Sequence, residues 1–304
     1  MTITDRPLED ARPVRTRLLL IVGAGLALVA GACTPYLVPP GAAPLRYRDA
    51  VFGAVTTTSN VTYGSALDQQ GQPVTLRLDV YAPAGDTVTS RPAIVWVHGG
   101  SFSGGTKTSA ELVDEATTFA KKGYVNASIS YRLSASGCSA SGPTASCIQA
   151  IADAMHDAQA AVRFLRANAT TYGIDPTRIA IGGTSAGAIT ALNVAYNPDD
   201  PGDSGTPGES SAVRAAVSLS GAKILGSASA GEPAVLLFHG TADTTVPYQW
   251  AVSTRDEAKA AGLPAYLTSW DGVGHVPYVA HRAEILDQTS NFLYWELDAA
   301  HAAN

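Results

Sequence analysis

Apolar and polar residues alternate along this chain in a way that predicts strands separated by helices. Residues 74–83 (VTLRLDVYAP) alternate in character, as a strand with one wet face does. Residues 92–100 (PAIVWVHGG) form a continuous apolar run before two glycines, which favours a strand buried on both faces. Residues 109–123 and 148–173 have helical spacing and each run ends at or near a glycine. We further predict strands in 124–133, 213–222, 234–243 and 264–270, and helices in 249–262 and 282–297.

Residues 178–196 (RIAIGGTSAGAITALNVAY) begin with the pattern of a buried strand and continue with the spacing of a helix. Only small residues join the two, and Ser185 lies in their middle. Strands alternate with helices nearly throughout, so the sequence predicts an α/β fold: a mostly parallel central sheet with helices on both faces. We find no internal repeat and no second domain.

The first 33 residues differ in composition from the rest of the chain, because basic residues are followed by a long apolar run. Arg12, Arg15 and Arg17 precede the apolar run 18–32, which is shorter than the roughly 20 residues that span a membrane. This is typical of an export signal. The end of the run, VAGAC, is similar to a bacterial lipobox that would lipidate Cys33, although Ala30 stands where leucine is usual. A lipoprotein, a secreted protein and an uncleaved anchor all remain open, and each places the folded domain outside the cytoplasm. We predict a signal over 1–33, a Pro-, Gly- and Ala-rich linker over 34–57 and a catalytic domain over 58–300.

The charge, the cysteines and the histidines of the chain indicate which partners, cross-links and cofactors to expect. Twenty basic and 26 acidic residues give a formal charge of −6, and no basic face is visible, so we expect no nucleic-acid partner. Cys138 and Cys147 lie close together in the sequence, and an exported chain meets an oxidising environment. We therefore predict a disulfide between them. The histidines are spread out and no H-E-x-x-H is present, so we expect neither a metal nor a cofactor.

The segment 183–187 (GTSAG) has the form G-x-S-x-G. At a strand-to-helix turn this pattern presents a nucleophilic serine in a strained backbone conformation. The small neighbours allow the sharp turn, and the following helix start favours a developing oxyanion. We therefore predict Ser185 as a nucleophile, which needs a general base and a carboxylate that orients the base.

A carboxylate and a histidine that could complete this set both follow Ser185 in the sequence, in that order. Asp243 follows one buried strand, and His275 follows the next strand in a glycine-rich turn. Asp271 is the nearest rival acid. His239 would face back toward its strand and make a structural hydrogen bond. His156, His281 and His301 are expected at the surface or in packing.

Two backbone regions suit an oxyanion hole. One donor is the N–H of Ala186, directly after the nucleophile. The other lies in HGGSF (98–102), where Gly100 and Ser101 can turn their amides into the site.

With these pieces in place the chain resembles an α/β-hydrolase. It is most similar to exported carboxylesterases of the hormone-sensitive-lipase and feruloyl-esterase-like (BD-FAE-type) groups, over roughly residues 58–298. The motifs VWVHGGSF, YRL, GTSAGA, LFHGTADTTVPY and GVGH carry the resemblance. It implies Ser185, Asp243 and His275 as a catalytic triad and the same oxyanion donors. Segments 197–211 and 222–233 are too short or polar for a substantial lid, so we expect a minimal lid and an open cleft.

These observations favour a serine carboxylic-ester hydrolase that acts through an acyl-enzyme on small or polymer-borne esters. An exported peptidase similar to prolyl oligopeptidases is an alternative, although the gating domain usual in those enzymes is absent. A non-catalytic binding protein on a hydrolase scaffold is another. A membrane could be contacted only through the N-terminus. Phe102, Tyr248, Trp250 and Trp270 lie near the predicted site loops.

Overall fold

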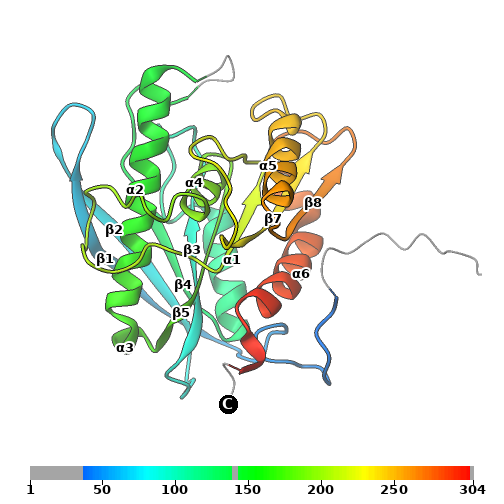
Figure 1. Cartoon of the computed structure of the whole chain (residues 1–304). Helices are drawn as coiled ribbons and strands as arrows, with labels where there is room; N and C mark the ends of the chain where they lie inside the picture. Colours follow the sequence, from blue (N-terminus) through cyan, green and yellow to red (C-terminus); the bar gives the residue numbers. More distant parts are fainter. Residues whose placement is uncertain (1–36, 139–142, 302–304) are drawn as a thin grey trace, which may run out of the picture. The chain divides into compact units, whose positions relative to one another are not determined.

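The fold is built on an eight-stranded sheet with the order β1-β2-β4-β3-β5-β6-β7-β8 (Figure 1). The computed structural model describes residues 37–138 and 143–301. Strands β1 and β2 form an antiparallel pair, β2 is antiparallel to β4, and all later pairs are parallel. The expected mostly parallel α/β sheet is present. The strands are β1 (Val55–Leu67), β2 (Pro73–Pro83), β3 (Arg91–Val97), β4 (Val125–Ser130), β5 (Ile174–Thr184), β6 (Ala215–Leu219), β7 (Ala234–Gly240) and β8 (Ala265–Trp270).

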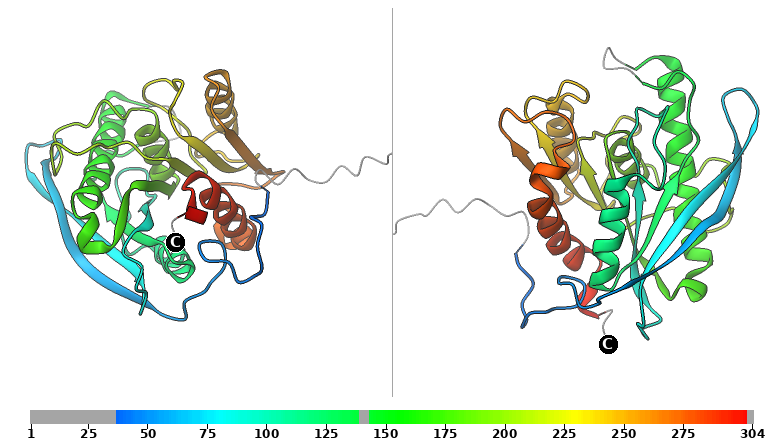
Figure 2. Two further views of the ribbon diagram at one scale, coloured as in Figure 1. Left: turned by 60° about the horizontal axis from the view of Figure 1, so that its bottom comes forward. Right: turned by 180° about the vertical axis from the view of Figure 1, so that it is seen from behind.

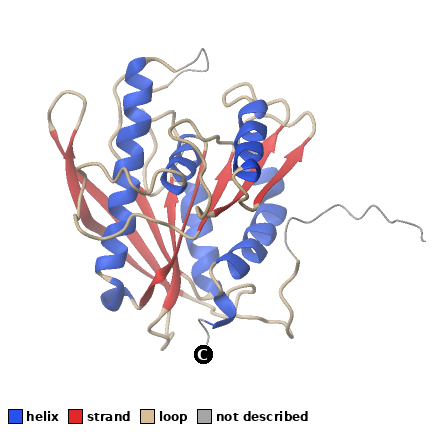
Figure 3. Cartoon of the chain, viewed as in Figure 1, coloured by secondary structure: helices blue, strands red, loops and turns tan. Residues whose placement is uncertain are grey.

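Helices cover both faces of this sheet (Figures 2 and 3). Successive residues of a strand point to opposite faces, so Val95 and Ile94 of β3 belong to different apolar clusters. The cluster on one face includes residues of α2, α4 and α5, and that on the other includes residues of α1 and α6. The helices are α1 (Ala110–Lys122), α2 (Ala145–Ala167), α3 (Ala169–Tyr172), α4 (Ala186–Ala195), α5 (Tyr248–Ala260), α6 (Tyr278–Glu296) and the 3-10 turn η1 (Ala299–His301).

The long helix predicted over 148–173 is divided into α2 and α3 at Asn168. The Asn168 side chain donates a hydrogen bond to the Phe164 carbonyl, and its backbone leaves the helical region with φ −105° and ψ 23°. Asparagine commonly competes with helical hydrogen bonds in this way. Helix α2 also begins earlier than predicted, because Thr144 caps it by accepting from the Cys147 amide at 3.2 Å.

Strand β1 is absent from the predicted elements. Its sequence is rich in Thr and Ser, and most of its residues are exposed because it lies at the sheet edge. Tyr63 is its one buried residue and donates to the Ser130 carbonyl at 2.8 Å. An edge strand that buries so little apolar surface has a weak period-two signal.

Part of the segment 34–57, which we predicted to be a linker, packs on the catalytic unit. Tyr47 is fully buried, and its ring packs edge-on against Tyr124. The Tyr47 amide donates to the Lys122 carbonyl at 2.7 Å, and Val51 and Phe52 donate to that of Lys121. The ordered unit therefore begins before residue 58.

Within the described ranges, no helix has the length and apolar character needed to cross a membrane. The predicted signal segment 1–33, with Cys33, lies outside the described residues.

Candidate active site

Ser185 stands between β5 and α4 in a backbone conformation that L-residues rarely adopt, with φ 55° and ψ −118°. The turn is tight because the end of β3 lies against it. A Cβ atom on Gly187 would lie 1.9 Å from the Val97 carbonyl oxygen, and one on Gly183 would lie 2.5 Å from the same atom. Both distances are far below van der Waals contact, so larger residues would force the elbow apart. This close approach accounts for the two glycines that flank the serine.

A chain of two hydrogen bonds joins three loops that are distant in sequence. The Nε2 atom of His275 lies 2.8 Å from Ser185 Oγ, and its Nδ1 atom lies 2.7 Å from Asp243 Oδ2. With its proton on Nδ1, the imidazole donates to Asp243 and accepts from the serine hydroxyl. The structure thus brings together the three residues that the sequence analysis selected.

Asp243 is held as a carboxylate by several donors. Its Oδ1 atom accepts from the Thr245 and Val246 amides at 2.8 and 3.0 Å. Burial opposes ionisation of this side chain, but hydrogen bonds from His239, His275 and the Val246 amide hold its pKa well below the usual range. The group that faces the imidazole is therefore negatively charged at neutral pH.

His239 is closer to the site than the sequence analysis expected. Its side chain is fully buried, and Nε2 lies 2.9 Å from the Val246 carbonyl oxygen and 3.1 Å from Asp243 Oδ2. Both neighbours are acceptors, so Nε2 carries a proton. The structural hydrogen bond we predicted is present, and the same N–H also reaches the carboxylate. Its spacing of four residues before Asp243 was the only sequence signal for this contact.

The predicted oxyanion donors surround the same serine. Ala186 is the first residue of α4, so its N–H has no intrahelical acceptor. Gly100 and Ser101 have φ of 118° and 53°, and both line a cavity that also contains Ser185. The carbonyl of Ser101 accepts from the Cys138 amide at 2.9 Å, which fixes the orientation of this loop.

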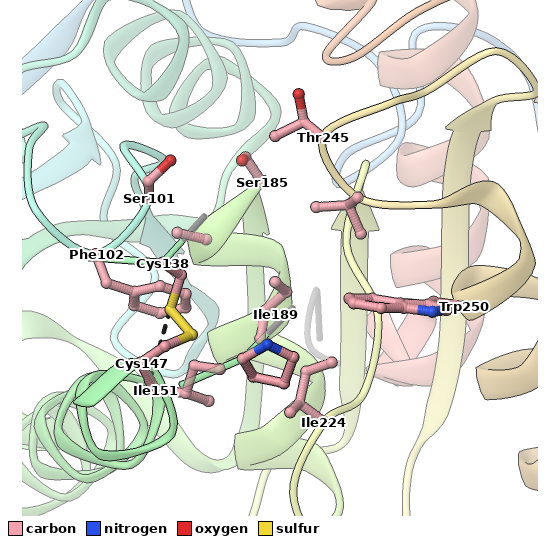
Figure 4. Close-up of a pocket in the computed structure, with 13 residues that line it drawn as sticks. Ser101, Phe102, Cys138, Cys147, Ile151, Ser185, Ile189, Ile224, Thr245 and Trp250 are labelled. Carbon is pink, nitrogen blue, oxygen red and sulfur yellow. Dashed lines mark hydrogen bonds between the residues drawn. A yellow bond between two sulfur atoms is a disulfide. The ribbon is translucent and has the colours of Figure 1, made fainter. Parts of the chain in front are cut away.

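An apolar cavity of about 60 Å³ opens beside Ser185 (Figure 4). The Cys138–Cys147 disulfide that we predicted is present and forms part of its wall. Ile224, from the segment 222–233, contributes another part, so this short loop shapes the pocket although it forms no large lid. The wall residues are Ser101, Phe102, Cys138, Pro143, Cys147, Ile151, Ser185, Ala186, Ile189, Ile224, Thr245, Val246 and Trp250.

A second, more polar cavity of about 380 Å³ also contains Ser185. Glu111, from the first turn of α1, lines it together with His275. The Thr184 hydroxyl donates to Glu111 Oε1. Burial raises the pKa of Glu111 to about 7, with a further rise from the charge of Asp114, against the effects of Thr184 and His275. The sequence analysis did not single out Glu111, because only the fold brings α1 to this cleft.

The other residues that the sequence analysis considered as candidates make contacts outside the Ser185–His275–Asp243 chain of hydrogen bonds. Asp271, the rival acid, accepts from the Thr241 hydroxyl at 3.0 Å. The Trp270 indole donates to Glu284, and its ring stacks on His281 with centroids 4.1 Å apart. Of the four aromatic residues placed near the site, Phe102 and Trp250 line the apolar cavity. In the described part of the chain no group of three or more His, Cys, Asp or Glu side chains could hold a metal.

Two protein families match the chain. Residues 78–223 match the family described as BD-FAE, and residues 208–294 match the family described as TAP-like protein. The first match contains the Ser185 elbow and the 98–102 loop, and the second contains Asp243 and His275.

Individual relatives are esterases by name. A chlorogenic acid esterase of Aspergillus niger is 29% identical over 144 residues, which is 43% of this chain and 27% of that protein. The isoprenylcysteine alpha-carbonyl methylesterase of Arabidopsis thaliana is 24% identical over 309 residues, which is 85% of this chain and 66% of that protein. The chain thus spans about a quarter and two thirds, respectively, of these relatives' lengths.

Among solved structures, a propionate-bound esterase of Thermogutta terrifontis superposes with a TM-score of 0.66. It is 25% identical in sequence, and the match covers 83% of this chain and 97% of that one. The same organism's esterase 2 phosphorylated by paraoxon superposes with a TM-score of 0.64 at 26% identity. That match covers 83% of this chain and 97% of the other.

Proposed function

We propose that this chain is a serine carboxylic-ester hydrolase that works through an acyl-enzyme intermediate. The chain belongs to the α/β-hydrolase superfamily and is carboxylesterase-like. The observation that supports this most strongly is the chain of hydrogen bonds from Ser185 through His275 to Asp243, at 2.8 and 2.7 Å. A nucleophile, a base within hydrogen-bond reach and a group that orients the base are the three requirements of this chemistry.

In the proposed first half-reaction, Ser185 Oγ attacks the ester carbonyl carbon while His275 Nε2 takes the serine proton. The carbonyl oxygen becomes an oxyanion and accepts hydrogen bonds from the amides of Ala186 and of Gly100 or Ser101. Each such donor contributes about 3 kcal/mol of transition-state stabilisation. When the C–O bond breaks, His275 gives its proton to the departing alcohol oxygen, and the acyl group stays on Ser185.

The second half-reaction replaces the alcohol with water. His275 takes a proton from a water molecule, whose oxygen attacks the acyl carbon. Collapse of this second tetrahedral intermediate returns the proton to Ser185 Oγ and releases the carboxylic acid. Asp243 stabilises the imidazolium in both halves, because its low pKa keeps it ionised beside the ring.

The comparisons support an ester substrate. A chlorogenic acid esterase and an alpha-carbonyl methylesterase are named among the relatives. The Thermogutta esterase was solved with propionate bound and also phosphorylated by paraoxon, an outcome expected of an enzyme with an activated nucleophile. The apolar cavity beside Ser185 is small, which suits a short or slender acyl group.

The test is the Ser185→Ala variant with p-nitrophenyl acetate as substrate. We expect kcat to fall by a factor of about 10³ or more, because the nucleophile is removed while the binding groups remain. A fluorophosphonate probe should label the wild-type chain and not this variant. Ser253→Ala is the matched control, since Ser253 is an exposed serine on α5 whose hydroxyl donates to the Gln249 carbonyl of the same helix.

Equal turnover by the wild-type chain and Ser185→Ala would refute the assignment. Hydrolysis of aminoacyl amides without any of esters would indicate a peptidase instead. A wild-type chain that neither turns over esters nor reacts with the probe would indicate a binding protein.

A further inference from the structure

Ser185 lies where two cavities of different character meet. Both cavities include Ser101, Ser185 and Thr245 in their walls, so they are two sides of one cleft. The apolar side is lined by Ile151, Ile189 and the disulfide. The polar side is larger and includes Glu111, Ser109 and Thr184. An ester bound at Ser185 has two halves, and each half faces one of these sides.

The position of His275 decides which half lies on which side. This inference rests on the proposed function, in which His275 protonates the departing alcohol oxygen. Proton transfer requires the alcohol oxygen to be within hydrogen-bond reach of Nε2. His275 lines the polar cavity and is not among the residues of the apolar one. The alcohol half therefore lies on the polar side, and the acyl half enters the apolar cavity.

Glu111 is the acidic side chain in the wall of the polar cavity. Its Oε1 atom accepts from the Thr184 hydroxyl, which fixes the direction of the carboxyl group. In the described part of the chain Oε1 is the carboxyl oxygen that makes a hydrogen bond, and Glu111 is a partly exposed residue in the wall of the cavity. The neighbouring acid Asp114 differs, because Arg282 and Tyr278 bond both of its oxygens.

The chemistry of this carboxyl group points to a hydroxyl as its partner. The pKa of Glu111 is raised to about 7, so both protonation states are populated near neutral pH. A carboxylate accepts a hydrogen bond and a carboxylic acid can donate one. A hydroxyl group satisfies either state because it both donates and accepts, whereas a cation would be attracted by the ionised state alone.

We propose that Glu111 recognises a hydroxyl group on the alcohol half of the ester, so that the enzyme prefers esters of polyhydroxy alcohols over esters of simple alkanols. The carboxyl group of Glu111 makes this contact, while Thr184 holds it in position. The apolar cavity selects the acyl group independently. Glu111 thus sets leaving-group specificity and does not take part in bond making.

Two esters of equal size isolate the hydroxyl contact. In 2-hydroxyethyl acetate a hydroxyl group stands where propyl acetate has a methyl group, and the acyl halves are identical. The quantity to measure is the ratio of kcat/KM for the two esters, determined by titration of the released acid. We expect the Glu111→Met variant to lower this ratio about tenfold, as the loss of one well-placed hydrogen bond does. Methionine retains the unbranched shape and helix propensity of glutamate without its oxygens.

Two further variants distinguish loss of the hydroxyl contact from a general loss of activity or folding. Glu111→Gln keeps a hydrogen-bonding group at the same place and should recover most of the ratio. Lys121→Gln removes a charge from the last turn of the same helix, away from the cavity, and should leave the ratio at the wild-type value. If Glu111→Met does not fold, Thr184→Val provides the test, because the carboxyl group then loses its fixed direction and the ratio should fall several-fold.

The outcomes also separate this inference from the proposed function. A wild-type chain that hydrolyses p-nitrophenyl acetate, together with an unchanged ratio in Glu111→Met, would overturn the role of Glu111 alone. So would an equal loss on both acetates, since that would show general support of catalysis or folding. A wild-type chain inactive on every ester would remove the proposed function and this inference with it.

Discussion

At the scale of single residues, the site depends on one imidazole that contacts two partners. His275 can do so because each partner is held independently: Ser185 by the strained elbow, and Asp243 by the amides of residues 245 and 246. A non-glycine residue with positive φ costs on the order of 1–3 kcal/mol. The packing of Gly183 and Gly187 against the end of β3 maintains this conformation.

Asp243 and Asp271 provide a direct comparison between the acid in contact with His275 and the nearest rival in sequence. We expect Asp243→Asn to lower kcat for p-nitrophenyl acetate by a factor of about 10³–10⁴, because an amide stabilises the wrong tautomer of the histidine. Asp271→Asn should stay within about threefold of wild type, since Asp271 bonds Thr241. A larger loss in Asp271→Asn than in Asp243→Asn would show that the catalytic arrangement differs from this one.

At the scale of elements, the parallel strands place their carboxyl ends at one edge of the sheet, and all the site loops leave from that edge. Strand β3 leads to the 98–102 loop, β5 to Ser185, β7 to Asp243 and β8 to His275. Ligand sites in such sheets lie at the carboxyl ends of strands. Helix α1 adds Glu111, and the start of α2 adds half of the disulfide.

The disulfide joins the loop after β4 to the first turn of α2 and forms part of the apolar cavity wall. We expect the Cys138→Ser, Cys147→Ser double variant to lose about 2–3 kcal/mol of unfolding free energy, as closure of a loop of this length implies. Its preference among p-nitrophenyl acetate, butyrate and octanoate should shift toward the longer chains, because the wall is no longer closed. Urea unfolding and the kcat/KM series measure the two effects.

Reducing agent serves as the control for that experiment. Dithiothreitol should move the wild-type chain toward the behaviour of the double variant and leave the double variant unchanged. Equal urea midpoints for the oxidised wild type and the double variant would contradict a stabilising bridge.

At the scale of the whole molecule, the chain divides into residues 1–33 and the hydrolase unit over 34–304. We propose that this disulfide-containing unit works outside the cytoplasm, where disulfides persist. We propose that residues 1–33 direct export and that Cys33 is the lipid attachment site. This proposal depends on the basic residues, the apolar run and the small residues before Cys33 in the sequence.

The Cys33→Ser variant tests this assignment in a bacterial host. We expect the wild-type chain in the membrane fraction with a mass increase on the N-terminal cysteine, and the variant without that increase. Cys138→Ser is the control for loss of a cysteine at a different place. A mature wild-type protein in the soluble fraction, with an unmodified N-terminus, would support secretion instead.

Several features followed from the sequence alone because they depend on local chemistry. The strand–helix alternation gave the fold class, since a buried strand and an amphipathic helix have different periodicities. The elbow needs small residues within five positions, and those are visible as GTSAG. The order of serine, acid and histidine identified three residues that the fold then brought into contact. Local signals failed for β1, which buries almost nothing on either face.

Only the tertiary structure decided which distant residues share the cleft. Glu111 and its partner Thr184 are 73 positions apart in the sequence. The periodicity of the helix that carries Glu111 indicates which residues pack against the sheet and does not indicate which line the cavity. The same holds for the disulfide as a cavity wall and for His239 beside Asp243. The periodicity of apolar residues along the sequence indicates whether a side chain is buried. Which distant residues become its neighbours depends on the order of the strands in the sheet. That order brings the carboxyl ends of β3, β5, β7 and β8 to the same end of the sheet. The site forms there because the loop after each of these strands contributes one of its parts.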